Sequence, residues 1–405
     1  MEWKEVRLGD VCSELSDGLH KAPKFIEKGE YIFVNAKNLY NGYILDNDPT
    51  KKTSREEYLK YKKPLGKHTI LYSIDGTIGN IARYRGEKCV LGKGACYLNC
   101  NPQIVESSYL YYQLQGPHFK SYIHLMSTGS TIKHISLKTM REYVFELPSL
   151  TDQRRIASIL SSLDRKIELN NKINADLEEM AQAIFKNWFV DFEPFKDGKF
   201  VDSELGMIPE GWKVGRLDEI ADVVGGSTPS KAKPEYYTQK GIAWLTPKDL
   251  SNHPAVYTSR GEIDITEEGY NSTSTKLMPK GTILFTSRAP IGYISIAQND
   301  ICTNQGFKSL VPKKAGTCFL YCFLKYVTPE IENKSTGSTF KEASGSLMKS
   351  LQVLMPEQKV FEDFETIVSP LFARIESLEK ESSRLSLLRD TLLPRLMSGE
   401  LEVPE

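Results

Sequence analysis

Two short stretches of this 405-residue chain repeat one another, Ser127-Thr128-Gly129-Ser130-Thr131-Ile132-Lys133 and Ser335-Thr336-Gly337-Ser338-Thr339-Phe340-Lys341. The second begins 208 residues after the first, which is the difference between 335 and 127. Two further landmarks recur in the same order at nearly the same offset. They are Trp3-Lys4-Glu5-Val6-Arg7-Leu8 with Trp212-Lys213-Val214-Gly215-Arg216-Leu217, and Leu71-Tyr72-Ser73 with Leu284-Phe285-Thr286. Because order and spacing are both kept, the sequence predicts a tandem duplication.

Each copy combines a globular part with a long helical part. The globular parts contain short apolar runs, such as residues 69–72 and 282–285, bounded by Gly, Pro, Asn and Asp, which is typical of small strands joined by loops. Pro148 and Pro356 close these parts, and a periodic segment follows each proline. The sequence therefore predicts an α+β fold of two tandem units of mixed α/β structure, each followed by one long helix.

The two helical segments carry apolar residues at alternating spacings of four and three, which is the seam of a coiled coil. The seams are Ile156, Leu160, Leu163, Ile167, Asn170, Asn174, Leu177, Ala181, Ile184 and Trp188, and then Phe361, Phe364, Val368, Leu371, Ile375, Leu378, Ser382, Leu385, Arg389, Leu392 and Leu396. A duplicated chain has approximate two-fold symmetry, so we expect the helices to pack as an antiparallel coiled coil. At about 1.5 Å per residue, roughly 33 residues give a rod on the order of 50 Å with one globular unit at each end. Asn170 and Asn174 would fix the register of the pair, with a functional contact as the alternative.

The repeat sets the expected boundaries. They are 1–149 for the first globular unit, 150–190 for the first helix, 191–209 for a linker, 210–356 for the second unit, 357–398 for the second helix and 399–405 for a tail. Lys and Arg outnumber Asp and Glu by 21 to 16 in the first unit and by 17 to 14 in the second, although the whole chain is neutral. Two basic units are a mild indication of phosphate binding.

Other classes of protein find little support in the sequence. No segment approaches the roughly 20 apolar residues of a membrane span, and the first residues lack the apolar region of a signal peptide, so we expect a cytoplasmic protein without membrane contact. The seven cysteines show no zinc-site spacing and are expected to be structural. A complete nucleotide-binding loop is missing, Asn101-Pro102-Gln103 lacks the rest of an amino-methyltransferase site, and Gly92-Lys93-Gly94 indicates a turn. We therefore expect no cofactor, no metal and no catalytic residue.

Several motifs together resemble one family. Each copy opens with Trp-Lys-x-x-x-Leu, ends in the Ser-Thr-Gly-Ser-Thr turn, and places a proline shortly before a glutamine, Gln153 or Gln358. The junction between the two copies at residues 205–212 and the closing residues 393–401 add to this resemblance. Over essentially its whole length the chain resembles the specificity subunits of type I restriction-modification systems. Leu150-Thr151-Asp152 stand before Gln153, whereas only Glu357 lies between Pro356 and Gln358, which leaves the phase of the second helix relative to its domain open.

The resemblance implies a role. Each globular unit would be a target-recognition domain that reads one half of a bipartite site on double-stranded DNA. The helices would set the unread spacer and dock two methyltransferase subunits, while restriction subunits would complete the enzyme. Methylation and cleavage would belong to these partners, so the chain itself would be non-catalytic. The helix residues expected at the partner-binding surfaces are Ile156, Leu160, Leu163, Ile167, Leu177, Phe364, Leu371, Leu378 and Leu385.

Lys133 and Lys341 follow the repeated turn at equivalent positions. The hydroxyls and amides of such a turn can hold a phosphate oxygen while the ammonium group neutralises it, and a purely structural turn is an equal alternative. Because the two halves should read different sequences, equivalent residues are expected to contact the DNA backbone.

Base-reading residues are expected where the copies differ. His20, Lys21 and Lys24 correspond to Thr228, Ser230 and Lys231; Asn35, Lys37 and Asn38 to Thr246, Lys248 and Asp249; Ser73 and Asp75 to Thr286 and Arg288; and Lys93 to Gln305. Arg or Lys can pair with guanine, Asn or Gln with adenine, and Asp with cytosine. The set predicted to bind DNA is Lys21, Lys24, Lys37, Asn38, Ser73, Lys93, Lys133, Lys231, Lys248, Arg288, Gln305 and Lys341, with a solvated loop residue as the alternative at each position.

Two other hypotheses remain open. A stand-alone coiled-coil scaffold that binds DNA without restriction partners would share the helices. An enzyme, such as a fused adenine methyltransferase or a nuclease, would need catalytic motifs that we do not find.

Overall fold

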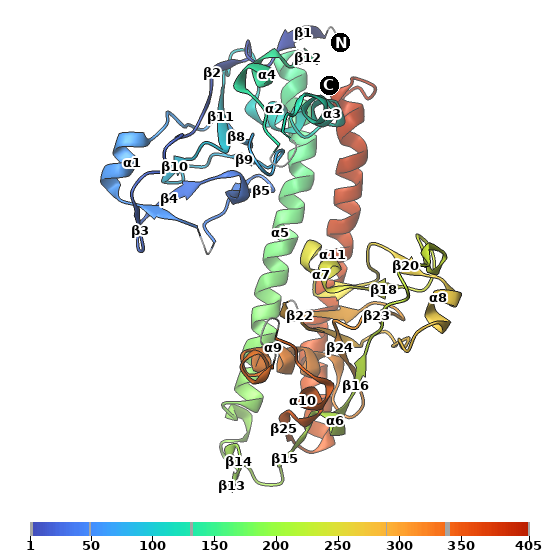
Figure 1. The fold of residues 1–405 in the computed structure, drawn as a ribbon. Helices are drawn as coiled ribbons and strands as arrows, with labels where there is room; N and C mark the ends of the chain where they lie inside the picture. Colours follow the sequence, from blue (N-terminus) through green and yellow to red (C-terminus); the bar gives the residue numbers. More distant parts are fainter. Residues whose placement is uncertain (1–2, 48–49, 130–132, 289, 337–340, 404–405) are drawn as a thin grey trace. The chain divides into compact units, whose positions relative to one another are not determined.

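The computed structural model describes residues 3–47, 50–129, 133–288, 290–336 and 341–403. The chain divides into two compact units: unit 1 contains residues 1–167 and 384–405, and unit 2 contains residues 168–383. The long helices α5 (Leu150–Phe189) and α11 (Gln358–Met397) each contribute one segment to each unit (Figure 1). Residues 130–132 and 337–340 of the repeated turn lie outside the described residues.

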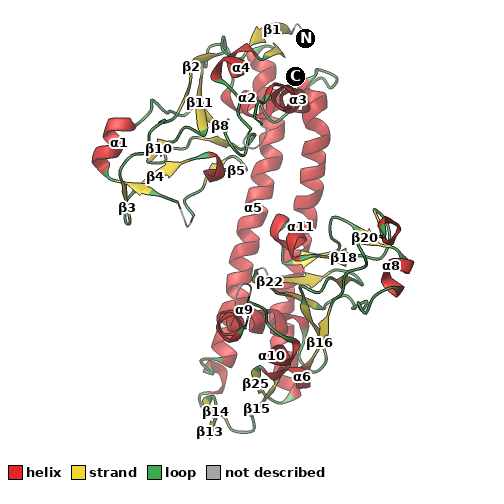
Figure 2. Cartoon of the chain, in the orientation of Figure 1, coloured by secondary structure: helices red, strands yellow, loops and turns green. Residues whose placement is uncertain are grey.

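The globular part of unit 1 is a set of small sheets with short helices between them (Figure 2). One sheet has the strand order β2-β11-β8-β9 and another β10-β4-β7-β3, while β1 pairs with β12 and β5 with β6. The strands are β1 (Lys4–Arg7), β2 (Cys12–Asp17), β3 (Phe25–Ile26), β4 (Tyr31–Val34), β5 (Leu39–Tyr40), β6 (Tyr43–Ile44), β7 (Lys52–Thr53), β8 (Thr69–Ser73), β9 (Ile81–Arg83), β10 (Cys89–Leu91), β11 (Ala95–Cys100) and β12 (Val144–Leu147). The helices are η1 (Ala36–Asn38), α1 (Arg55–Tyr61), α2 (Ser107–Gln113), α3 (Pro117–Met126) and α4 (Leu137–Glu142).

Strand β8 shows why this sequence forms a two-sided sheet. All five of its residues are buried, and the strand lies between β11 and β9. Side chains alternate across a strand, so Ile70 and Tyr72 face one core with Tyr109 and Phe119, whereas Leu71 faces a second core. The apolar run predicted as a strand therefore packs on both faces.

Unit 2 repeats this arrangement. Its main sheet has the order β16-β24-β21-β22-β19, and β15 pairs with β25 as β1 pairs with β12. The parallel pair Trp244↔Cys302 repeats the parallel pair Ile32↔Cys89 of unit 1. The strands are β13 (Phe200–Ser203), β14 (Gly206–Pro209), β15 (Lys213–Arg216), β16 (Ala221–Gly225), β17 (Tyr237–Thr238), β18 (Trp244–Leu245), β19 (Tyr257–Thr258), β20 (Asp264–Ile265), β21 (Ile283–Ser287), β22 (Ile291–Ala297), β23 (Cys302–Thr303), β24 (Lys308–Pro312) and β25 (Gln352–Met355). The helices are η2 (Glu193–Phe195), α6 (Leu217–Ile220), η3 (Pro234–Tyr236), α7 (Pro247–Asn252), α8 (Glu267–Asn271), α9 (Thr317–Lys334) and α10 (Gly345–Ser350).

The segment expected as a linker, residues 191–209, is folded. It forms η2 and the hairpin β13–β14, in which Phe200 pairs with Pro209. Phe195 lies edge-on to Trp212, with ring centroids 5.0 Å apart. Aromatic packing of this kind fixes the entry into the second globular part.

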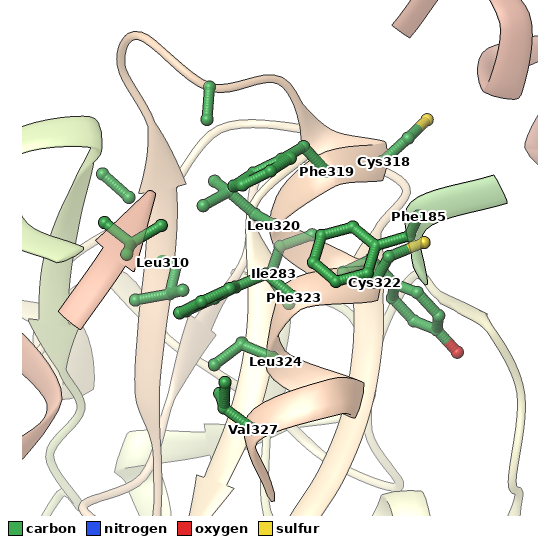
Figure 3. Packing of buried hydrophobic residues seen from close by; sticks show 14 of the residues in the cluster. Phe185, Ile283, Leu310, Cys318, Phe319, Leu320, Cys322, Phe323, Leu324 and Val327 are labelled. Carbon is green, nitrogen blue, oxygen red and sulfur yellow. The ribbon is translucent and has the colours of Figure 1, made fainter. Parts of the chain in front are cut away.

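Helix α9 forms the centre of the unit 2 core. Nine of its residues are buried, among them Phe319, Phe323 and Val327, and they belong to one cluster with Ile283 and Leu310 of the sheet. Figure 3 shows these side chains together with Phe185 of α5. Because α9 is apolar on most of its surface, the sheet and the long helices can both pack against it.

Within unit 2, residues 168–189 of α5 pack against residues 358–383 of α11. Asn170 donates from Nδ2 to the Glu381 carboxylate at 2.9 Å and to the Ser382 hydroxyl at 3.3 Å. Toward the end of α5, Phe189 stacks on Phe361 with ring centroids 6.4 Å apart. Residue numbers rise along one helix as they fall along the other, so these segments are antiparallel, as the sequence predicts.

Within unit 1, the remaining helix segments join the core of the globular part. Ile156, Leu160 and Leu396 are buried in the same cluster as Tyr109 and Phe119. The Arg389 guanidinium pairs with the Asp164 carboxylate at 2.9 Å. The predicted seam residue Arg389 is thus matched by a charge on the facing helix, which offsets part of its desolvation.

Gln153 connects the globular part of unit 1 to α5. Its side chain is buried, its Oε1 accepts from Glu106 N at 2.8 Å, and its Nε2 donates to the carbonyls of Pro148 and Ile104 at 2.9 and 3.2 Å. Gln358 keeps one such contact in unit 2, donating to Lys314 O at 3.2 Å, but it is exposed. The difference follows from the shorter spacing between proline and glutamine in the second copy.

Two carboxylates of α11 hold the globular part of unit 2. Glu365 accepts from the amides of Cys318 and Phe319 at 3.3 and 2.8 Å, at the N-terminus of α9 where the helix dipole favours an anion. Gly316 permits this approach, since a Cβ there would lie 2.2 Å from the Glu365 carboxyl carbon. Glu379 accepts from Val256 N at 2.7 Å and from Tyr257 N at 3.0 Å.

Glu379 predicts a pH effect on stability. Burial, together with the neighbouring charges of Glu178 and Glu376, raises the pKa of the Glu379 carboxyl to about 7 despite its two amide hydrogen bonds. Its stabilising contribution is therefore complete below the unfolded pKa of 4.5 and is lost as the pH rises to about 7. We expect thermal unfolding of the full chain to show this loss, at most about 3 kcal/mol, and Glu379→Gln to abolish it. The exposed Glu362→Gln on the same helix is the control, and equal pH profiles for Glu379→Gln and wild type would contradict the assignment.

The described residues include no helix with both the length and the apolarity needed to cross a bilayer. All seven cysteines are described and are free thiols, and burial raises the pKa of Cys12 and Cys89 to about 12. The raised pKa keeps the Cys12 and Cys89 thiols protonated near neutral pH, which makes both poor nucleophiles.

Candidate nucleic-acid interface

Unit 2 brings four of the residues predicted to bind DNA around one cavity. The cavity has a volume of about 960 Å³ and is lined by Lys231, Lys248, Arg288 and Gln305, together with Trp244. Lys231 lies in the loop before η3, Lys248 in α7, Arg288 directly after β21 and Gln305 between β23 and β24. These residues come from separate loops and from α7. They converge because strands β21 and β23 end beside the cavity, directly before Arg288 and shortly before Gln305.

The chemistry of the cavity suits a phosphodiester chain and the edges of bases. Lys231 and Lys248 are exposed, and the Lys248 ammonium lies 3.7 Å from the Glu262 carboxylate in an exposed pair that a phosphate oxygen can replace. Arg288 is about one-third exposed and lies 3.7 Å from the Glu342 carboxylate. Gln305 accepts a hydrogen bond from Thr228, which orients its amide. Arginine and glutamine side chains are the ones that read guanine and adenine in the major groove.

In unit 1, the predicted lysines Lys21, Lys24, Lys37 and Lys93 are all exposed. Lys37 belongs to η1, and Lys93 lies between β10 and β11, where its Nζ is 3.6 Å from the Asp75 carboxylate. These lysines remain candidates for phosphate contact.

Asn38 is buried, and its side chain is engaged in local structure. Its Oδ1 accepts from Asn35 N at 3.0 Å, and its Nδ2 donates to Leu45 O at 3.1 Å and Thr50 Oγ1 at 2.9 Å. In unit 2 the Asp249 carboxylate makes the corresponding contact with Thr246 N at 2.7 Å. A contact that recurs in both copies and is closed to solvent favours a structural role for Asn38.

Ser73 is also buried, with a side chain that closes a hairpin. Its hydroxyl accepts from Asn80 N at 2.8 Å, and Thr286 accepts from Tyr293 N at 2.9 Å in the same way. The hydroxyl therefore has a structural partner in both units.

Lys133 and Lys341 are exposed, next to bridges that recur in both units. Thr128 bridges His134, and Thr336 bridges Glu342. The Lys341 ammonium donates to Glu332 O at 3.3 Å, a contact that leaves donors for a second partner.

Three ionisable residues at this edge of the sheets were not among those expected to contact DNA. They are His134 in unit 1 and Lys308 and Glu342 in unit 2. Glu342 pairs with Arg288 and Lys308, and His134 Nδ1 lies 4.0 Å from the carboxylate of Asp75, which is one of the expected base readers. His134 and Glu342 each follow a predicted lysine by one residue, so the 208-residue offset contained a signal for them.

Comparison with known proteins identifies the family. The model of the type I restriction modification DNA specificity domain matches residues 1–179 and again residues 209–385. The MjaIX specificity subunit of Methanocaldococcus jannaschii is 40% identical over 190 residues, 46% of this chain and 44% of that relative. The HindI specificity subunit of Haemophilus influenzae is 24% identical across 99% of this chain and all of that relative.

A crystal structure of a type I restriction-modification S subunit from M. genitalium has the same fold. Its TM-score is 0.60 at 20% identity, and the match covers 98% of this chain and 96% of that one. The two family matches begin 208 residues apart, the offset of the internal repeat. This chain belongs to the type I restriction modification DNA specificity family and contains its domain twice.

Proposed function

We propose that the two family domains each read one half of a bipartite site on double-stranded DNA, and that the chain serves as the specificity subunit of a type I restriction-modification complex. The cavity of unit 2 carries this proposal, because it collects Lys231, Arg288 and Gln305 from separate loops and Lys248 from helix α7. The double match of a DNA specificity domain supports two readers in one chain.

We further propose that the chain is non-catalytic and assembles with two methyltransferase subunits and with restriction subunits. The long helices carry large apolar side chains that this chain itself leaves exposed, which supports docking of partner proteins there. These are Leu169, Met180, Ile367, Leu387 and Leu388, of which Leu387 is 70% exposed. Of the predicted helix residues, Ile156, Leu160, Phe364 and Leu378 are buried within this chain and have little surface left for a partner. The others are half-buried: Leu163, Ile167, Leu177, Leu371 and Leu385.

Selection from random DNA tests the function. The complex with its methyltransferase is mixed with random duplexes, retained DNA is sequenced, and the chain alone is assayed for methyl transfer as the control. Two short sequences at a fixed gap are expected. Retention without any sequence preference would favour the stand-alone scaffold, and methylation by the chain alone would contradict the non-catalytic assignment.

The two equivalent lysines should contribute through charge alone. Lys133→Ala or Lys341→Ala is expected to weaken binding to all duplexes similarly and to reduce the slope of log affinity against log salt by about one unit, because one counterion fewer is released. Titrations at several salt concentrations measure this, with Lys359→Ala, an exposed lysine of α11, as the control. Unchanged slopes for both variants would assign the turn a purely structural role.

A further inference from the structure

One position at the sheet edge is the same in both units but carries opposite charge. Ile74 N donates to Gly94 O at 3.0 Å, and Ser287 N donates to Gly306 O at 2.8 Å. Ile135 N donates to Ile74 O and Ala343 N to Ser287 O, both at 2.9 Å. The same two backbone hydrogen bonds are therefore made by Ile74 in unit 1 and by Ser287 in unit 2. The residues that follow them, Asp75 and Arg288, are structurally equivalent.

The partners of this position are equivalent as well. Asp75 forms an antiparallel bridge with His134, and Arg288 forms the same bridge with Glu342. The Asp75 carboxylate lies 3.6 Å from Lys93 Nζ and 4.0 Å from His134 Nδ1. Around Arg288 the signs are reversed, because Glu342 lies 3.7 Å from the guanidinium and 3.5 Å from Lys308 Nζ.

A third residue lies near this position in each unit, and its side chain differs between the two units. Lys93 precedes Gly94 in unit 1, as Gln305 precedes Gly306 in unit 2. In unit 2, Arg288 and Gln305 line the same cavity. One backbone frame therefore presents an acid, a lysine and a histidine in one unit, and an arginine, an amide and an acid in the other.

We propose, building on the proposed function, that this position sets the hydrogen-bond polarity with which each unit reads one base. Arg288 donates to the O6 and N7 acceptors of guanine, and Asp75 accepts from the N4 amino group of cytosine. Glu342 is a positioning residue that holds the guanidinium, and His134 and Lys93 hold the carboxylate. Arg288 and Asp75 are about 35% and 25% exposed, and ion pairs open to solvent in this way contribute little to folding, so substitutions here should leave the fold intact.

Two substitutions change the hydrogen-bonding group of the reader, one at the same size and one with a shorter side chain. Arg288→Gln and Asp75→Asn each place an amide at the position, and an amide pairs with adenine in the major groove. Each variant should replace its base by adenine at one position of one half-site, with a loss of roughly 10- to 100-fold in affinity for the original sequence. Glu342→Gln should lower discrimination at the Arg288 position alone, at an unchanged melting temperature.

The experiment is selection of random DNA by the complex with its methyltransferase, run in parallel for wild type and variants. Arg260→Gln, whose arginine pairs with Asp264 in unit 2, and Asp46→Asn, whose acid pairs with Lys52 in unit 1, are the matched controls and should give the wild-type sequence. A wild-type bipartite sequence that Arg288→Gln and Asp75→Asn both leave unchanged would overturn this inference and leave the proposed function standing. Absence of any selected sequence for the wild type would overturn both.

Discussion

Replacing residues 1–149 with the corresponding domain of a relative should change one half of the recognised sequence and leave the other half as it was. The reason is that the units have separate cores: the buried clusters around Tyr109 and Leu71 contain no residue of the clusters around Phe319 and Leu284. Each domain has its own core, so exchanging a domain also exchanges the loops that read its half of the site. Sequencing of methylated sites in a strain that carries the exchanged gene measures the result.

The exchange of residues 1–149 has one structural requirement. Ile156, Leu160 and Leu396 of the long helices are buried in the core of unit 1, so the donor domain must present a compatible apolar face to them. A chimera that keeps residues 150–405 unchanged and melts like the parent is the appropriate control. A change in both half-sites would show that the two readings are not independent.

Lengthening both helices by two heptads should lengthen the unread spacer by about six base pairs. Insertions near Asn171 and Ser383 would enter both helices beside the Asn170–Ser382 contact, next to the boundary between the two compact units. At about 1.5 Å per helical residue, fourteen residues add roughly 21 Å, against 3.4 Å per base pair. Seven-residue steps keep the apolar stripes in register.

Rotation of one reader about the helices accompanies this insertion. The preferred spacer should therefore settle near a length compatible with the twist of DNA, and the methylated sites of the variant strain give that length directly. An insertion in one helix alone breaks the facing register and serves as the control, with loss of activity expected. An active double insertion with an unchanged spacer would mean that the helices dock partners but do not set the gap.

The sequence predicted the main strands and the two long helices, but it did not predict the orientation of polar side chains in the loops. The apolar runs around Leu71 and Leu284 form strands because each is short, continuous and bounded by turn-forming residues, which is typical of a strand buried on both faces. The helices predicted for 150–190 and 357–398 span Leu150–Phe189 and Gln358–Met397, since the proline before each and the long apolar stripe both restrict them.

Polar loop residues have two ways to satisfy their hydrogen bonds, and sequence alone does not choose between them. Asn38 and Ser73 turn inward and serve backbone amides, whereas Lys93 and Gln305 remain exposed. Residues 191–209 are expected as a linker because they lie between the first helix and the second copy of the repeat, yet Phe195 packs on Trp212 and the segment folds. His134 and Glu342 were identified as partners of Asp75 and Arg288 only through the backbone bridges that join them in the structure.

The backbone arrangement shared by Asp75 and Arg288 affects how the recognised sequence can change in evolution. The frame there is made of backbone amides and of the inward hydroxyls of Ser73 and Thr286, so it does not depend on which side chain occupies the outer position. If this position reads a base as proposed, a single codon change there would redirect the chain to a new genomic target at little cost to folding. In a bacterial or archaeal population, such a change would rewrite which sites in the genome carry the host's own mark, and would renew the barrier that incoming phage DNA has to pass.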